Sequence, residues 1–224
     1  MLYYKKLNPQ IALIKLNAIK CVFIAMIVYF CGSIANSAEN KTILAFGDSL
    51  TAGYGLPTED SFTVQLEKKL NSKGLPATVI NAGVSGDTTS GGYSRLEWVL
   101  SSYSNIDLVI LTLGGNDALR AINPEVTRSN MDKMLEILTS RNIPTLIGGM
   151  MAPPNLGQVY GKDFNSIYSD VADKYDVPLY PFFLDGVAGI LEFNQADTIH
   201  PNKKGVDIIT ERLSPAIINL LGRN

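Results

Sequence analysis

The chain has 224 residues, of which 46% are hydrophobic and 18% are charged. This length and composition suit one well-buried domain of ordinary globular type. The formal net charge is −2, so the chain as a whole has no excess of basic residues that would favour nucleic acid as a partner. The sequence contains one histidine, so any mechanism that needs an imidazole base must use His200.

The first 37 residues differ in composition from the rest of the chain. Four lysines precede an uncharged run at residues 21–30, and no acidic residue occurs before Glu39. Small and polar residues then follow, with a cleavage site after Ser37, as in a secretory signal. We therefore expect residues 1–37 to be an export leader and residues 38–224 to be the mature, periplasmic or secreted domain. The alternative is an uncleaved membrane anchor, although the apolar run is shorter than the ~20 residues that span a bilayer.

Removal of this leader would change the chemistry open to the protein. Both cysteines, Cys21 and Cys31, lie in it, so the mature chain would have no disulfide, no thiol nucleophile and no cysteine-based metal site. Taking the four leader lysines from the 19 basic residues leaves 15 against 21 acidic residues. This balance favours a small-molecule substrate over nucleic acid, and leaves the leader as the only membrane-binding segment.

Beyond the leader, short apolar runs alternate with longer amphipathic segments, a pattern typical of a parallel sheet covered by helices. The expected strands are residues 42–46, 77–81, 108–113, 145–149 and 178–180. The third is almost continuously apolar and should lie at the sheet centre. The expected helices are residues 60–72, 90–102, 124–141, 163–175 and 202–221. These elements predict a three-layer α/β/α sandwich, in which ligands bind beyond the carboxyl ends of the strands.

Three polar clusters come directly after expected strands. Residues 47–50 (Gly-Asp-Ser-Leu) place Ser49 in a turn at a helix start, either as a nucleophile or as a capping residue. Residues 81–89 offer backbone N–H groups that stabilise an oxyanion, or form a plain loop. Asn116, in the Gly-Gly-Asn-Asp segment after the third strand, is either a neutral oxyanion donor or part of a turn.

A fourth cluster, Asp197 to His200, precedes the last expected helix. A spacing of three in a loop lets the carboxylate accept the imidazole Nδ1–H, which leaves Nε2 free to take a proton from a hydroxyl. The alternative is a histidine that only caps or packs at the helix entrance. Together with Ser49 and the two donor segments, Asp197 and His200 meet the requirements for acyl transfer through an acyl-enzyme.

These blocks resemble those of the GDSL, or SGNH, hydrolase family, named for catalytic Ser, Gly, Asn and His residues. The blocks are residues 47–50, Gly86 within residues 85–88, Asn116 within residues 114–117, and the Asp197-x-x-His200 segment. The resemblance spans the mature chain and implies a flavodoxin-like sheet of order 2-1-3-4-5, no metal and no organic cofactor. It also implies that the Ser49 backbone N–H joins Gly86 and Asn116 in the oxyanion hole.

Within this family the sequence is most similar to small periplasmic arylesterases and acyl-CoA thioesterase/lysophospholipases, because residues 147–168 resemble their mobile substrate loop. The residues of this loop expected at the substrate are Met150, Met151, Pro153, Leu156 and Tyr160. Their apolar character favours aliphatic or aryl acyl groups. We expect a monomer that hydrolyses a small acyl ester or thioester.

Two other functions stay open at this point. A sugar-ester deacetylase or acyltransferase would use the same scaffold and triad, because a fold does not select the acyl donor or the alcohol. A non-catalytic flavodoxin-like binding protein would use the loop of Ser49, Thr51 and Gly53 to hold a phosphate at a helix start. This second alternative leaves Asp197 and His200 without a role.

Overall fold

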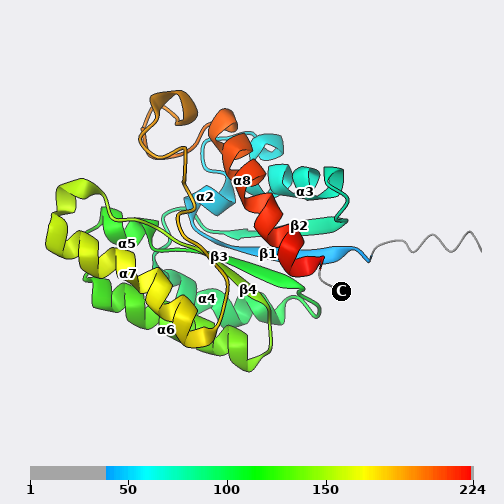
Figure 1. Cartoon of the computed structure of the whole chain (residues 1–224), viewed down its shortest axis with the longest axis horizontal. Helices are drawn as coiled ribbons and strands as arrows, with labels where there is room; N and C mark the ends of the chain where they lie inside the picture. The colour runs from blue at the N-terminus through cyan, green and yellow to red at the C-terminus, as the bar shows by residue number, and fades with distance from the viewer. Residues whose placement is uncertain (1–38, 223–224) are drawn as a thin grey trace, which may run out of the picture. The chain divides into compact units, whose positions relative to one another are not determined.

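The computed structural model describes residues 39–222, which form a parallel sheet with helices on both faces (Figure 1). The expected export leader and both cysteines lie outside these residues. The strands are β1 (Lys41–Gly47), β2 (Ala77–Gly83), β3 (Leu108–Thr112), β4 (Thr145–Gly148) and β5 (Leu179–Tyr180). Their order is β2-β1-β3-β4-β5, so the predicted flavodoxin-like arrangement is confirmed.

The helices form the two outer layers. They are α2 (Ser49–Ala52), α3 (Phe62–Ser72), α4 (Thr89–Ser101), α5 (Gly115–Leu119), α6 (Pro124–Ser140), α7 (Gln158–Tyr175) and α8 (Lys203–Leu221). Three short 3₁₀ helices are η1 (Thr58–Asp60), η2 (Pro154–Leu156) and η3 (Leu191–Phe193). Helices α3 and α8 pack together on one face of the sheet, whereas α4, α6 and α7 cover the other (Figure 1). The predicted three-layer sandwich is therefore confirmed.

Helix α7 differs most from its predicted bounds, because it begins at Gln158 rather than at residue 163. The first turn is mostly exposed: Val159 is 78% exposed, whereas Tyr160 is partly buried against the core. The fully buried apolar stripe begins at Phe164. A turn with one partly buried side chain shows little helical periodicity in the sequence.

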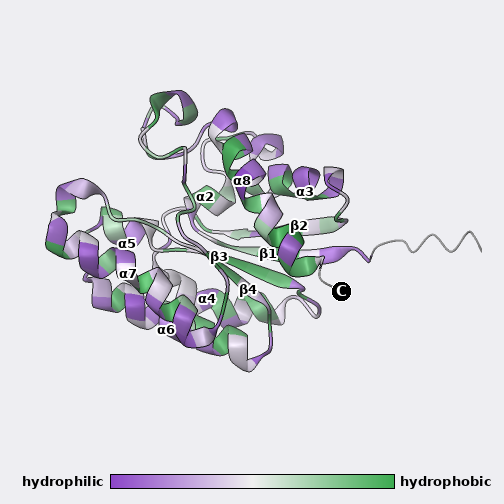
Figure 2. Cartoon of the chain, viewed as in Figure 1, coloured by the Kyte–Doolittle hydropathy of each residue, from purple (hydrophilic) through white to green (hydrophobic). Residues whose placement is uncertain are grey.

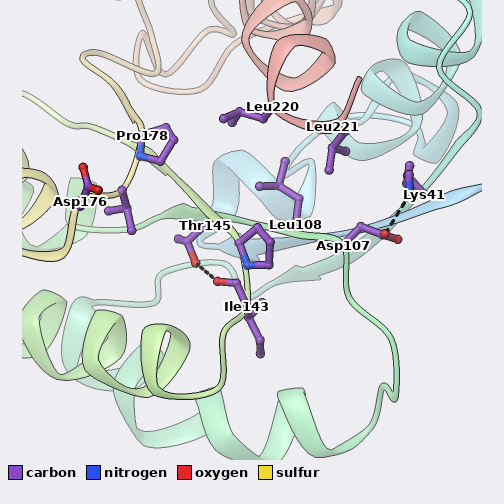
Figure 3. A pocket seen from close by; sticks show the side chains of 11 residues that line it. Lys41, Asp107, Leu108, Ile143, Thr145, Asp176, Pro178, Leu220 and Leu221 are labelled. Atoms are coloured by element: carbon purple, nitrogen blue, oxygen red, sulfur yellow. Dashed lines mark hydrogen bonds and ion pairs between the residues drawn. The ribbon is translucent and has the colours of Figure 1, made fainter. Parts of the chain in front are cut away.

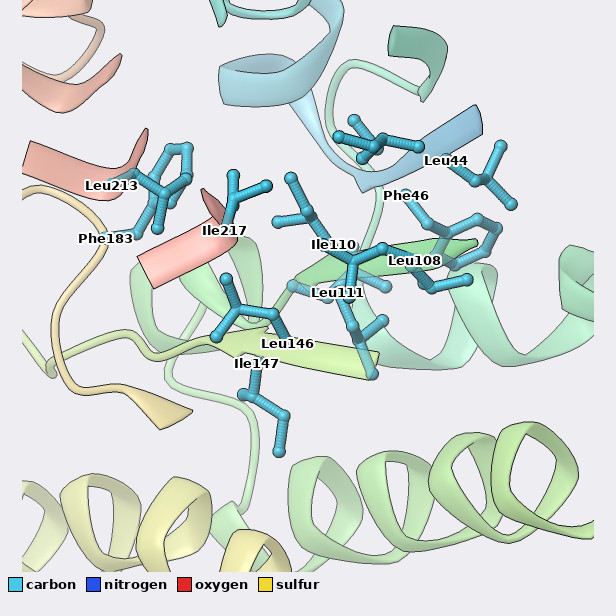
Figure 4. Packing of buried hydrophobic residues seen from close by; sticks show 14 of the residues in the cluster. Leu44, Phe46, Leu108, Ile110, Leu111, Leu146, Ile147, Phe183, Leu213 and Ile217 are labelled. Carbon is cyan, nitrogen blue, oxygen red and sulfur yellow. The ribbon is translucent and has the colours of Figure 1, made fainter. Parts of the chain in front are cut away.

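Strand β3 is the centre of the core, as its apolar sequence predicted. Every residue of β3 is buried, and the strand pairs with β1 on one side and β4 on the other. Its Leu108, Ile110 and Leu111 lie beside core side chains of neighbouring strands and of α8 (Figure 4). Colouring by hydropathy shows the same division, with apolar strands between helices whose outer faces are polar (Figure 2). Burial of each large side chain contributes about 1.5–3 kcal/mol to the free energy of folding. This burial stabilises the sheet, at whose strand ends the polar residues lie.

The amino and carboxyl ends of the strands carry different groups of residues. A pocket of about 410 Å³ lies at the amino ends of the strands, where Lys41, Leu108 and Thr145 line it together with the end of α8 (Figure 3). Lys41 pairs there with Asp107 at 3.5 Å. The polar clusters predicted from the sequence lie at the opposite, carboxyl ends of the strands. In residues 39–222, no helix is long and apolar enough to cross a membrane.

Candidate active site

Ser49 is the first residue of α2, directly beyond the end of β1. The Oδ1 atom of Asp48 accepts the Leu50 N–H at 3.0 Å, so Asp48 caps this helix. The alternative interpretation of Ser49 as the capping residue is therefore wrong. The preceding Gly47 is required by space, because a Cβ atom there would lie 2.6 Å from the Thr112 carbonyl oxygen. The Ser49 hydroxyl does not cap this turn and can bind another partner.

That partner is His200. Its Nε2 atom lies 2.9 Å from the Ser49 Oγ, and its Nδ1 atom lies 2.6 Å from Asp197 Oδ2. The other carboxylate oxygen, Asp197 Oδ1, accepts the backbone N–H groups of Ile199 and His200, each at 3.0 Å. The backbone hydrogen bond from His200 is the main cause that lowers the pKa of Asp197 to about 2. Asp197 is therefore ionised at neutral pH and orients the imidazole with its proton on Nδ1.

Hydrogen bonds fix the loop that carries Asp197 and His200. The His200 carbonyl accepts the Gln195 N–H at 2.7 Å. Asn202 caps α8 through the Gly205 N–H at 3.2 Å, which places His200 close to a fixed helix start. The Tyr54 ring lies 4.7 Å from the imidazole ring, between centroids, and covers it on one side.

Of the predicted oxyanion donors, Asn116 lines the same pocket as Ser49 and His200. Asn116, on α5, donates from Nδ2 to the Asp87 carbonyl at 2.9 Å and to Asp48 Oδ2 at 3.3 Å. Gly86 has a φ of +81°, a left-handed conformation that glycine adopts at little cost. Its carbonyl accepts from Arg120 Nη2 at 2.8 Å, whereas its N–H donates to no group within residues 39–222.

Two buried acids that the sequence did not single out support these donors. Asp117 is fully buried and accepts from the Thr89 N–H (2.9 Å), the Thr89 hydroxyl (2.5 Å) and the Thr127 hydroxyl (3.0 Å). This network ties α5, and with it Asn116, to α4 and α6. Asp48 is only 2% exposed, and the loss of solvation raises its pKa to about 6, against the opposing effect of the Leu50 N–H. No local pattern marks either acid as buried.

An apolar pocket of about 620 Å³ opens beside Ser49. Met150, Met151 and Pro153 of the predicted substrate loop line it, but Leu156 and Tyr160 do not. The Tyr160 hydroxyl instead donates to the Ile122 carbonyl at 2.8 Å. The remaining apolar lining, which the sequence did not reveal, comes mainly from α5 and from the segment after β5, and includes Leu119, Phe182, Leu184, Ala188 and Ile199. In a single sequence, apolar loop residues that line a pocket cannot be distinguished from those that only pack against the core.

Metal binding needs a different set of side chains. Across the described part of the chain, no three His, Cys, Asp or Glu residues group in a way that could hold a metal ion. The polar groups at the site are instead a hydroxyl, an imidazole, carboxylates and amide donors. This set suits proton transfer and the stabilisation of an oxyanion.

Comparison with known proteins gives consistent matches. The model of the GDSL-like lipase/acylhydrolase family matches residues 45–208. An arylesterase of Vibrio mimicus is 36% identical over 198 residues, which are 88% of this chain and 98% of that protein. Thioesterase 1/protease 1/lysophospholipase L1 of Escherichia coli K12 is 34% identical over 185 residues, covering 81% and 87% of the two chains. The crystal structure of AlinE4, an SGNH-hydrolase family esterase, is 47% identical with a TM-score of 0.70, covering 82% and 98%.

Proposed function

Since the chain belongs to the GDSL-like lipase/acylhydrolase family and is a serine ester hydrolase, we propose that Ser49 is its nucleophile, His200 its base and Asp197 the orienting acid. The observation that carries this proposal is the continuous line of two short contacts, Ser49 Oγ to His200 Nε2 at 2.9 Å and His200 Nδ1 to Asp197 Oδ2 at 2.6 Å. A hydroxyl becomes a strong nucleophile when an oriented base can accept its proton.

The reaction then has two halves. His200 Nε2 takes the Ser49 proton as Oγ attacks the acyl carbonyl, and the imidazolium, paired with Asp197, returns the proton to the leaving alcohol or thiol. Water deprotonated by the same imidazole hydrolyses the acyl-enzyme and frees Ser49. The N–H groups of Ser49 and Gly86 and the Asn116 amide stabilise the oxyanion in both halves. The longer contact of Asn116, to Asp48 at 3.3 Å, is the one that the oxyanion would replace.

The proposed substrate is a small ester or thioester with an aliphatic or aryl acyl group. The pocket beside Ser49 is lined mainly by apolar side chains, and each buried methylene stabilises a bound chain by about 0.8 kcal/mol. The names of the similar arylesterase and thioesterase/lysophospholipase fit this chemistry. A sugar-ester deacetylase is less well supported, because the same lining offers few partners for sugar hydroxyls.

We also propose export through residues 1–37. We further propose that the protein acts as a monomer, since one chain supplies every residue of the site.

A fluorophosphonate probe tests the nucleophile, since it forms a covalent adduct only with an activated serine. Mass spectrometry should place the adduct on Ser49 in the wild-type protein, and Ser49→Ala should neither react nor hydrolyse 4-nitrophenyl butyrate. Ser140→Ala, at an exposed position on α6, is the matched control and should behave as wild type. An adduct on another residue, or wild-type turnover by Ser49→Ala, would disprove the assignment.

Substrate class needs a separate panel. The initial rates should be compared for 4-nitrophenyl esters of two to sixteen carbons, palmitoyl-CoA, lysophosphatidylcholine and an acetylated sugar. We expect higher kcat/KM for the 4-nitrophenyl esters than for the acetylated sugar. The reverse order would favour the deacetylase alternative on the same triad.

A further inference from the structure

One guanidinium group joins the segments that carry the proposed nucleophile and oxyanion donors. Arg95, on α4, donates from Nη2 to the Gly47 carbonyl and from Nη1 to the Ala82 carbonyl, both at 2.9 Å. Its Nε donates to Asp87 Oδ2 at 2.7 Å. The side chain is 18% exposed, and the guanidinium lies 4.0 Å from the centroid of the Phe46 ring. Arg95 thus binds three acceptors from three different segments.

These acceptors lie where position matters most for the reaction. Gly47 ends β1 two residues before Ser49, and Ala82 lies near the end of β2. Asp87 directly follows Gly86 in the loop before α4. A planar guanidinium presents its donors in fixed directions, which a lysine ammonium on a flexible stem does not. The ends of the two strands and this loop are therefore fixed relative to one another by a single rigid group.

Asp87 extends this connection to the third donor. Its carboxylate is bound by Arg95, while its backbone carbonyl accepts the Asn116 amide at 2.9 Å. A shift of Asp87 would therefore move Gly86 through the chain and Asn116 through this hydrogen bond. Displacement of Gly47 would in turn move the Ser49 N–H.

We propose that Arg95 is a positioning residue that sets the relative placement of the three oxyanion donors, the N–H groups of Ser49 and Gly86 and the amide of Asn116. It touches neither the substrate nor the reacting atoms. The proposal rests on the proposed function, because it assumes that these groups bind the oxyanion. Arg95 then affects the transition state, in which negative charge develops on the carbonyl oxygen, far more than the bound substrate.

The decisive variant is Arg95→Lys, which keeps the charge and loses the planar fork. With 4-nitrophenyl butyrate we expect kcat to fall about 10- to 100-fold and KM to change less than about threefold, since loss of one whole oxyanion donor costs about 10²–10³. Arg141→Lys is the matched control, because Arg141 also pairs with an acid of α4, Glu97, at an exposed position far from the site. It should keep wild-type kcat. An unchanged kcat in a folded Arg95→Lys variant overturns the proposal.

Inhibition separates positioning from general stabilisation of the fold. An alkyl trifluoromethyl ketone forms a tetrahedral oxyanion with the active serine, whereas the corresponding methyl ketone binds mainly as a substrate-like competitor. In Arg95→Lys, Ki for the trifluoromethyl ketone should rise in proportion to the loss in kcat/KM, and Ki for the methyl ketone should stay within about twofold. Equal changes in both constants would mean that Arg95 only maintains the pocket, which contradicts the proposal.

A double variant tests the link to the third donor. The losses in kcat for Arg95→Lys and Asn116→Ala should combine less than multiplicatively, because part of the effect of Arg95 acts through Asn116. Fully multiplicative losses would contradict the link. If Arg95→Lys fails to fold, Asp87→Asn replaces it, with the same kcat and Ki outcomes expected. A fluorophosphonate adduct that remains on Ser49 in these variants shows that any negative result concerns Arg95 and not the nucleophile.

Discussion

The Nε2 atom of His200 lies 2.9 Å from the hydroxyl oxygen of Ser49, although the two residues are 151 positions apart in the chain. Ser49 begins α2 at the end of β1, and His200 lies just before α8. They meet because α8 packs against α3 on one face of the sheet, and α2 lies against α3. The geometry of the reacting pair therefore depends on helix packing on that face.

The hydrogen bonds of Asp197 predict the effect of Asp197→Asn. Two backbone N–H groups hold the Oδ1 position as an acceptor, so the new amide nitrogen must take the Oδ2 position and donate to His200 Nδ1. The imidazole proton is then forced onto Nε2, where it prevents His200 from acting as a base. We expect kcat to fall on the order of 10³- to 10⁴-fold in an ester assay at pH 7.5. Asp207→Asn, on the exposed side of α8, should stay near wild type, and activity within threefold of wild type in Asp197→Asn would refute the role.

Replacement of Asn116 by alanine tests the oxyanion assignment. The variant loses a neutral donor without adding charge, so kcat should fall roughly 10²- to 10³-fold while KM changes little. Steady-state kinetics with 4-nitrophenyl butyrate measure both constants, and Asn105→Ala, in an exposed loop, is the control. A loss confined to KM would make Asn116 a substrate-binding residue instead.

The pocket predicts how acyl length is read. Ala188 lines it, and Ala188→Phe would fill space that a longer chain needs. Loss of two or three buried methylenes costs about 2 kcal/mol, so kcat/KM for an octanoyl ester should fall roughly 30-fold. The acetyl ester, which has a single carbon beyond the carbonyl, should change less than about twofold. Val159→Phe adds an aromatic ring at a residue that is 78% exposed and outside the pocket lining, and it should leave both rates unchanged. Equal losses for both esters would mean that the acyl chain lies elsewhere.

Burial of Asp48 predicts a pH-dependent contribution to stability. Its pKa is raised from 3.8 to about 6, so the folded protein holds this proton more tightly than the unfolded chain does. The contribution is fully present below pH 3.8 and is lost as the pH rises through about 6. The free energy of unfolding of the wild type, minus that of Asp48→Asn, should therefore fall by roughly 2–3 kcal/mol between about pH 4 and pH 7.

Chemical denaturation across this pH range measures that difference. Asp173→Asn, at an exposed position on α7, is the control, and its difference from the wild type should not follow this curve. A difference for Asp48→Asn that is constant from pH 4 to pH 7 would mean that Asp48 titrates normally.

Sequence reasoning succeeded where the deciding interactions are local. The five strands and five long helices follow from runs and periodicities of apolar residues, and most of their ends differ from the prediction by one or two residues. Asp197 and His200 lie in contact because three residues of loop are enough to join a carboxylate to Nδ1. The family was recognised from blocks that each span only a few residues, and the comparisons confirm it.

Tertiary structure alone decided the interactions between distant segments. Arg95 meets Gly47 across 48 positions of sequence. Asp48 is buried where Gly115 and Asn116 of α5 approach its carboxylate. Neither environment can be read from the local sequence. Leu156 and Tyr160 fall outside the pocket lining for a related reason, since the packing of α7 determines which loop residues face Ser49. Periodicity and short spacings are properties of the chain itself. Burial, hydrogen-bond partners and shifted pKa values depend on what packs around a residue. In this protein they are determined by the packing of the helices on the sheet.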